Sequence, residues 1–213
     1  DTMKNARVGA AAKTGCVRRF FHTMCVYSSV FGGKTLVDFG LENIERGLIG
    51  NLVGQVIEPQ SNVFATQCSG IELRRMIVGG SRMLTESEVI GNNQELWGKL
   101  AKALLLIAGQ CDKKSIGAVA QAGTTVLTMM EGGNDAAESR EFDSTYSRLV
   151  NSVIPGHNPT PEMEQGAGFF ITSLQGLCQS RPGVYLGVLQ KILTAEQGQI
   201  LQLLLQKQGV QLV

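Results

Sequence analysis

The chain has 213 residues, of which 43% are hydrophobic and only 17% are charged, and its net charge is +1. A chain of this length can bury a substantial core, and its composition excludes a disordered tail. The near-neutral charge provides no field that would hold nucleic acid or an anionic membrane. The five cysteines are odd in number and include no Cys-x-x-Cys pair, which predicts reduced thiols. The longest apolar run, Ala103 to Ala108, is too short to span a bilayer, so no membrane insertion is expected.

The first predicted helix is rich in aromatic residues. Apolar side chains recur at helical spacing over residues 17–31, and Gly32-Gly33 is expected to end the helix. The following segment, 35–44, fits either a brief helix or an extended turn.

A second apolar stripe over residues 48–57 predicts another helix, which is expected to end at Pro59. Three glycines interrupt it, and each costs helix stability by roughly 1 kcal/mol relative to alanine. Such glycines predict a close approach to another helix. They are Gly47, Gly50 and Gly54.

An αα-hairpin is predicted over residues 62–109. Its first helix has an apolar stripe over 64–84, and a break follows at 85–93. Asn92 stands three positions before Glu95, which predicts an N-cap with its reciprocal acid. The second helix turns Leu96, Trp97, Leu100, Ala101, Leu104 and Ile107 inward and carries Glu95, Lys99 and Lys102 on the opposite side. Because such a hairpin cannot bury its apolar faces alone, it must stack on neighbours.

The stretch 113–130 combines two glycines with a β-leaning Thr-Thr-Val-Leu run, so helix and strand interpretations compete. Helix is favoured because the sequence on both sides is helical. Asp135 and Glu138 then resemble a capping box ahead of an apolar stripe over 142–153.

The C-terminal third predicts three more helices. Thr160-Pro161 is expected to begin the first of them, whose inward face extends over 167–178. A helix over 184–193 follows. Thr194 with Gln197 is expected to cap a last, leucine-rich helix.

Together these patterns predict eight or nine helices in antiparallel pairs and no strand. The hairpin recurs about every 40 to 50 residues, the period of HEAT-type arrays. The expected fold is therefore all-α, a right-handed α-solenoid of HEAT-like helix pairs that forms one arch over the whole chain. Its approximate units are 13–60, 62–110, 111–155 and 160–207. The first residue is Asp1 rather than Met, which leaves open that the chain is a piece of a longer protein.

No catalytic, cofactor-binding or metal site is expected. The sequence has no phosphate loop ending in Gly-Lys-Ser/Thr and no Gly-x-Ser-x-Gly elbow. The glycine pairs at 32–33, 79–80 and 132–133 are interpreted as helix ends or close-packing points. His22, beside the aromatic face of the first helix, is interpreted as structural. His157 with two nearby acids is only a weak metal pattern.

Six cations are candidates for binding a partner protein. They are Arg18, Arg19, Arg74, Arg75, Lys99 and Lys102. The two arginine pairs lie near the middle of two successive first helices, where a solenoid would present them as a basic ridge to an acidic partner. The alternative interpretation is an ordinary solvated helix face.

Three stretches of sequence, in this order, resemble one family. The first comprises VRRFFHTMCVYSSVFGG and LVDFGLENIERGLIGNLVGQVIEP. The second comprises CSGIELRRMIVGGSRMLTES and ELWGKLAKALLLIAG, and the third FDSTYSRLV, SLQGLCQSRPGVYLGVLQKIL and the final QLV. Their succession is similar to the C-terminal end of the importin-α re-exporters, the cellular apoptosis susceptibility exportins of the importin-β superfamily.

This resemblance implies the C-terminal arch of a longer exportin that shuttles between nucleus and cytoplasm. The implied partners are importin-α and GTP-bound Ran, with nucleoporins as a further class. Because the GTP chemistry belongs to Ran, the resemblance implies neither enzymatic activity nor a cofactor. The family's main Ran-binding surface lies toward the N-terminal arch, so this part alone is expected to bind cargo weakly. The alternatives are another importin-β-superfamily receptor, a generic helical-repeat scaffold, or an all-helical enzyme.

Overall fold

The computed structural model describes residues 2–128 and 165–212, and the side chains of 15–111 and 165–212. Every regular element in these ranges is a helix, which confirms the all-α prediction. The elements are α1 (Thr2–Phe31), the π-helix η1 (Thr35–Leu41), α2 (Glu42–Ile44), α3 (Leu48–Leu52), the π-helix η2 (Val53–Ile57), α4 (Glu58–Gln67), α5 (Gly70–Glu86), α6 (Glu88–Gly91), α7 (Gln94–Thr128), α9 (Gly166–Ser180), α10 (Val184–Ile192) and α11 (Ala195–Gln208). The predictions for residues 132–164, including His157, fall outside the described residues.

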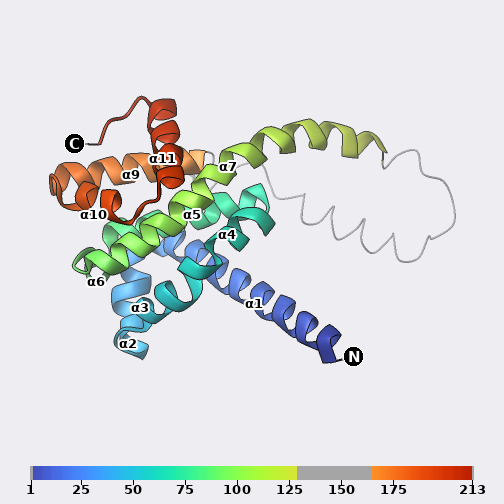
Figure 1. Cartoon of the computed structure of the whole chain (residues 1–213), viewed down its shortest axis with the longest axis horizontal. Coiled ribbons are helices and arrows are strands. Elements are labelled where there is room, and N and C mark those ends of the chain that lie inside the picture. The colour runs from blue at the N-terminus through green and yellow to red at the C-terminus, as the bar shows by residue number, and fades with distance from the viewer. Residues whose placement is uncertain (1, 129–164, 213) are drawn as a thin grey trace.

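The helix α1 of the first hairpin runs parallel to α5 of the second, and α4 of the first runs parallel to α7 of the second (Figure 1). The helices α1 and α5 form a first layer, and α4 and α7 form a second layer. In the first layer, α1 and α5 touch where Cys25 meets Gly79, and just beyond the end of α1 Gly33 meets Arg82 of α5. In the second layer, Glu58 of α4 pairs with Lys102 of α7. The contacts advance in the same direction along α1 and α5, and likewise from Gly54 with Lys99 to Glu58 with Lys102 in the second layer. Each hairpin therefore stacks on the next with like helices adjacent, as in helical-repeat proteins.

The third hairpin continues this stack. The first residue of α9, Gly166, lies against Arg74 of α5. The Tyr185 ring of α10 packs on Trp97 at the start of α7, with ring centroids 4.6 Å apart. The helix α11 contacts α7 through Ile200, so α9 extends the first layer and α11 extends the second.

The superhelical handedness and the four repeat units stay predictions. The helix α7 continues without interruption from Gln94 to Thr128, across the expected boundary between 62–110 and 111–155. This continuity confirms the helix interpretation of residues 113–128.

One hydrophobic core joins the hairpins. Phe21 of α1 and Phe64 of α4 stack with centroids 5.5 Å apart, and both rings are fully buried. Leu73, Trp97 and Phe170 continue the same core through α5, α7 and α9. Burying each such side chain contributes about 1.5–3 kcal/mol, so this shared core is the main source of cohesion between the hairpins.

Several helix ends match the predictions. The first helix ends at Phe31, and Gly32 adopts the left-handed conformation with φ of 94°. The segment 35–44 is helical rather than an extended turn. Thr194 and Gln197 form a complete capping box ahead of α11, with N–H to oxygen distances of 3.3 and 3.1 Å.

Two helix starts in the central hairpin were predicted wrongly. The apolar stripe over 64–84 is divided between α4 and α5, and Ser69 begins α5 with a capping box to Glu72. The two helices share one apolar pattern because both face the same core, so the periodicity hides the break. The start of α7 is capped by Asn93 rather than Asn92, since the Asn93 side chain accepts the Leu96 N–H at 3.1 Å.

The sequence predicted that the second helix ends at Pro59, and this prediction is wrong. Pro59 lies in the first turn of α4, where no N–H donor is required, and the chain continues helically to Gln67. The preceding turn, η2, is a π-helix, and the Glu58 N–H bonds to the carbonyl of Val53, five residues back. This wider turn accommodates the proline ring without interrupting the helix.

The glycines of the second helix do not mark a close helix contact, which corrects the prediction. A Cβ atom at Gly47 or Gly50 would have no neighbour within 4 Å, and one at Gly54 would only reach the Lys99 amine at 4.0 Å. Gly47 instead supplies a positive φ of 81° at the start of α3.

The close approach occurs between α1 and α5. A Cβ atom on Gly79 would lie 1.9 Å from the carbonyl oxygen of Cys25, so only glycine fits there. The Ser28 hydroxyl donates to the Gly79 carbonyl at 2.9 Å and ties the same two backbones together. The interpretation of Gly79-Gly80 as a close-packing point is confirmed.

The substitution Gly79→Ala should lower the free energy of unfolding by about 3 kcal/mol, because the new methyl group meets rigid backbone rather than a movable side chain. Gly187→Ala in α10 is the matched control, since its Cβ would meet nothing within 4 Å. That change should be neutral or stabilising by up to about 1 kcal/mol. Urea unfolding followed by circular dichroism and by the fluorescence of Trp97, the only tryptophan, measures both. Equal midpoints for the two variants would contradict the backbone contact.

Candidate functional site

Four ionisable side chains meet where α1 runs beside the first half of α5. Arg18 and His22 are one helical turn apart on α1, and Glu72 and Arg75 occupy neighbouring turns of α5. We call these four residues the α1–α5 cluster. The pKa of His22 is lowered by partial burial and by the charge of Arg75, with a smaller opposing effect of Glu72 and a further lowering by Arg18. The other three groups therefore all act electrostatically on His22.

Glu72 is largely committed to capping α5. Its carboxylate accepts the backbone N–H of Ser69 at 2.8 Å, while its own N–H donates to the Ser69 hydroxyl at 3.3 Å. Burial alone would raise the pKa of Glu72, but these hydrogen bonds and the charges of Arg18 and His22 outweigh it and lower the pKa. The carboxylate is ionised yet occupied by the helix terminus.

Among the described residues, Arg18 and Arg75 of the cluster have no counter-ion at contact distance. No described carboxylate lies within 4.0 Å of Arg18 or Arg75, although both side chains are only partly exposed. The Nε atom of Arg18 and the Nε2 atom of His22 are buried and have no hydrogen-bond partner. Unsatisfied buried polar groups are uncommon in folded proteins and call for a specific explanation.

The other two arginines of the predicted ridge lie to either side of this cluster. Arg19 is exposed on α1, and Arg74 faces the first residue of α9. The structure thus brings Arg18 and Arg75 together, with Arg19 and Arg74 flanking them. His22 and Glu72 were not predicted as members, because only the parallel alignment of α1 and α5 places them there.

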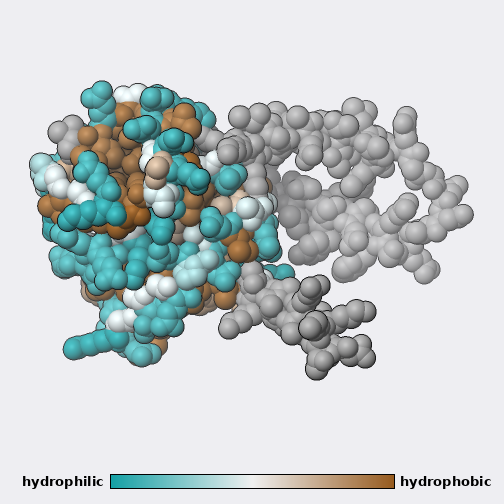
Figure 2. All heavy atoms as spheres, in the orientation of Figure 1, coloured by the Kyte–Doolittle hydropathy of each residue, from teal (hydrophilic) through white to brown (hydrophobic). Residues whose placement is uncertain are grey.

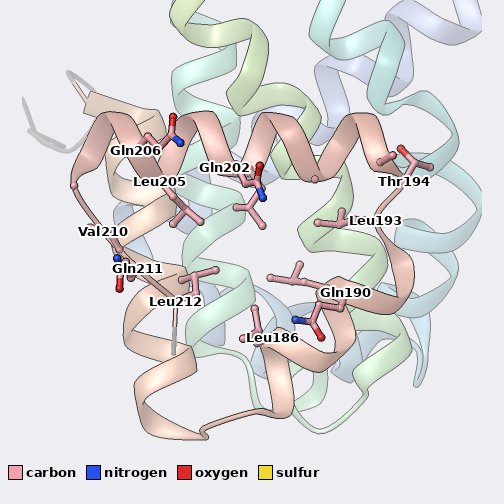
Figure 3. Close-up of a pocket in the computed structure, with 15 residues that line it drawn as sticks. Leu186, Gln190, Leu193, Thr194, Gln202, Leu205, Gln206, Val210, Gln211 and Leu212 are labelled. Atoms are coloured by element: carbon pink, nitrogen blue, oxygen red, sulfur yellow. The ribbon is translucent and has the colours of Figure 1, made fainter.

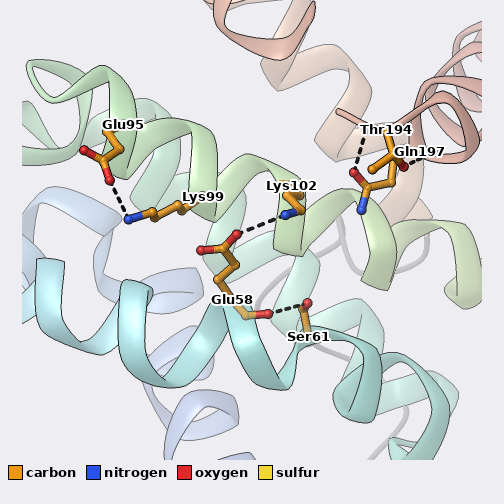
Figure 4. A network of polar contacts seen from close by, with 7 residues as sticks. All are labelled: Glu58, Ser61, Glu95, Lys99, Lys102, Thr194 and Gln197. Atoms are coloured by element: carbon orange, nitrogen blue, oxygen red, sulfur yellow. Dashed lines mark hydrogen bonds and ion pairs between the residues drawn. The ribbon is translucent and has the colours of Figure 1, made fainter. Parts of the chain in front are cut away.

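Lys99 and Lys102 lie elsewhere, in the second layer (Figure 4). Lys99 pairs with Glu95 at 2.6 Å, and Lys102 pairs with Glu58 at 3.0 Å. Both lysines therefore have a neutralising carboxylate, whereas no described carboxylate pairs with Arg18 or Arg75. Their role in partner binding stays untested, and they do not adjoin the α1–α5 cluster.

A hydrophobic groove lies at the C-terminal end of the stack. It occupies about 900 Å³ between α10, α11 and the tail Gly209–Leu212 (Figure 3). Leucines such as Leu186, Leu193 and Leu205 line it, and glutamines such as Gln190 and Gln202 stand at its margin. The same region is a brown area framed by teal in Figure 2. The groove has no charged lining residue, and the sequence patterns gave no signal for it because the tail forms one wall.

The described part of the chain contains no group of three or more His, Cys, Asp or Glu side chains that could hold a metal ion. All five cysteines are free, and only Cys16 is exposed. Burial raises the pKa of Cys25 and of Cys178, so both remain unreactive thiols. No described helix combines the length and the apolar character needed to cross a bilayer.

The sequence of this chain matches a known protein family. The family model described as the C-terminus of CAS/CSE proteins matches residues 6–204. The chain belongs to the CAS/CSE family. Comparison with curated proteins and with solved structures gave no match.

The CAS/CSE family consists of exportin-type nuclear transport receptors rather than enzymes. Its members shuttle between nucleus and cytoplasm and in general interact with importin-α and Ran. The match confirms the family resemblance found in the sequence, and it includes all four residues of the α1–α5 cluster.

We expect the free energy of unfolding of this CAS/CSE chain to fall between pH 7.5 and pH 5.5, in part because of His22. The pKa of His22 is lowered in the folded state, so the unfolded state binds the proton more readily. The stability that neutral His22 supplies is present above its ordinary pKa of about 6.5 and is lost as the pH falls through the lowered value. Chemical unfolding at several pH values, with wild type and His22→Gln compared, measures this contribution. Parallel pH profiles in the two proteins would contradict the assignment.

Proposed function

We propose that this chain is the C-terminal part of an exportin that binds importin-α together with GTP-bound Ran and carries it from nucleus to cytoplasm. The observation that carries the proposal is the CAS/CSE family match over residues 6–204. The stack of helical hairpins supports it, because transport receptors of this type hold their partners on extended helical surfaces. Release would follow GTP hydrolysis by Ran, so this chain itself requires no catalytic group.

The outer face of α1 supports the idea that further hairpins precede this one in the working protein. Phe20, Tyr27 and Phe31 share one face of α1 and are 46%, 42% and 60% exposed. An exposed apolar face of this kind usually marks an interaction surface. A preceding helix pair that packs on α1, as α1 packs on α5, would cover these rings and extend the stack.

The proposed mechanism relies on small displacements between hairpins. Each hairpin contacts mainly its neighbours, so slight changes at successive interfaces add up to a change in the curvature of the whole stack. Ran and importin-α would each favour the same curvature, and the binding of one would then strengthen the binding of the other. Such coupling requires no contact between this part of the chain and the nucleotide.

The test uses the full-length parent protein immobilised with importin-α in solution. Retention of importin-α should increase at least tenfold when Ran loaded with a non-hydrolysable GTP analogue is added, compared with Ran loaded with GDP. The 213-residue chain alone should retain importin-α weakly, and the parent lacking these residues should lose the nucleotide-dependent increase. Retention that is indifferent to the nucleotide on Ran would instead indicate a generic helical scaffold.

A further inference from the structure

In the described part of the chain, three lysines are paired with carboxylates, whereas Arg18 and Arg75 are not. Lys34, Lys99 and Lys102 each have a carboxylate within 3.0 Å. Arg18 and Arg75 have none within 4.0 Å, although neither side chain is fully exposed. A partly buried charge loses hydration, and it is usually compensated by an opposite charge. The compensating anion for these arginines is therefore not found among the described residues.

The two nitrogens without a hydrogen-bond partner, Arg18 Nε and His22 Nε2, indicate which kind of ligand would fit this surface. Arg18 Nε is a hydrogen-bond donor at every physiological pH, and His22 Nε2 becomes one when the imidazole is protonated. Both belong to partly exposed side chains on one face of α1, so a small reorientation can turn them toward a ligand. Two cationic donors beside a third cation, Arg75, match the oxygens of an anion.

The single acidic residue of the cluster does not fill this role. Glu72 accepts the Ser69 N–H at 2.8 Å and caps α5, and it makes no ion pair within 4.0 Å of either arginine. The cluster consequently keeps two permanent positive charges against one negative charge. Arg19 and Arg74 add two more positive charges at its flanks.

An apolar side chain beside these charges distinguishes a peptide from a free inorganic anion. Ile71 is 62% exposed and precedes Arg75 by one helical turn, so both lie on the same outer face of α5. An exposed isoleucine cannot form a hydrogen bond or an ion pair with phosphate, but it can contact an apolar side chain of a peptide in which that side chain lies between two acidic residues.

We propose that the surface formed by Arg18, His22, Ile71 and Arg75 binds an acidic segment of a partner protein. Carboxylates of the segment pair with the two guanidinium groups, and an apolar side chain between them rests on Ile71. Arginine suits this task because its planar group binds a carboxylate through two parallel hydrogen bonds. This binding site goes beyond the proposed transport function and does not depend on the identity of the cargo.

The site has a built-in pH dependence. The charged groups that act on His22 are Arg18 on its own helix and Glu72 and Arg75 on α5, and burial together with the two arginines lowers its pKa. A bound carboxylate stabilises the imidazolium and raises that pKa again. Binding therefore takes up a proton, and the affinity for the acidic segment increases as the pH falls from 7.5 to 5.5.

The test measures binding of a fluorescent peptide, Glu-Asp-Leu-Glu-Asp-Glu-Leu-Asp, to the 213-residue chain by fluorescence anisotropy. The wild-type chain should bind it, and the double variant Arg18→Gln with Arg75→Gln should bind at least tenfold more weakly. Arg181→Gln removes the same charge from an exposed position at the end of α9 and should change the affinity less than twofold. His22→Gln should flatten the pH dependence of the affinity.

Two further measurements keep the proposal falsifiable. Arg18→Lys with Arg75→Lys preserves the charges and should retain more affinity than the glutamine variant, whose folding is checked by circular dichroism and by Trp97 fluorescence. The chain has two histidines, so the NMR signal missing from His22→Gln identifies His22, and its pKa should rise when the peptide binds.

Three results would overturn the proposal. These are equal binding by wild type and the double glutamine variant, equal binding of the peptide in which Gln and Asn replace the acids, and binding of inorganic phosphate as tight as that of the peptide. None of them bears on nucleotide-dependent retention of importin-α by the parent protein. The two proposals can therefore fail independently.

Discussion

The contact between the backbones of α1 and α5 is the constraint on which the first half of the structure depends. Cβ atoms on Gly79 and Gly33 would lie 1.9 and 2.2 Å from carbonyl oxygens of the opposite segment. Two such points fix both the spacing and the register of the helices. Hydrogen bonds reinforce them, from Ser28 to the Gly79 carbonyl and from the Gly33 N–H to Glu86 at 2.6 Å. Neither helix can slide along the other without breaking backbone contact.

This register determines which charges meet. With Cys25 opposite Gly79, the turn of α1 that carries Arg18 and His22 lies beside the first turns of α5. Glu72 could face these cations, but the start of α5 requires an acceptor at Ser69, and the carboxylate serves that need. In the second layer, Glu58 and Lys102 bridge α4 and α7 directly. Lys99 and Lys102 of the second layer are thus paired with carboxylates, while no described carboxylate pairs with Arg18 or Arg75 of the first layer.

Apolar periodicity was sufficient to predict most helices, because a helix that packs against the core needs apolar residues at every third or fourth position, and this spacing is visible in the sequence. It could not predict the break between α4 and α5 at Ser69, since the helices on both sides of the break turn the same residue types toward one core. Glycine composition predicted a close contact, but the sequence could not tell which glycines make it: Gly50 has no neighbour, while Gly79 touches backbone. The candidate site was predictable only in part, because the pairing of Lys102 with Glu58 spans 44 positions and the grouping of Arg18 with Arg75 requires two parallel helices.

The interface of α7 with α10 and α11 is of a different kind. Here a Cβ atom on Gly98 or Gly109 would meet the side-chain ends of Ile192 and Ile200, at 3.0 and 2.8 Å, rather than a backbone. Branched side chains can rotate and settle again, whereas a carbonyl in a helix cannot. Displacements within the stack are therefore absorbed more easily between α7 and the α10–α11 pair than between α1 and α5. The backbones that carry the α1–α5 cluster are therefore held by direct contact, and the side chains of Arg18, His22 and Arg75 are left to adjust to a ligand.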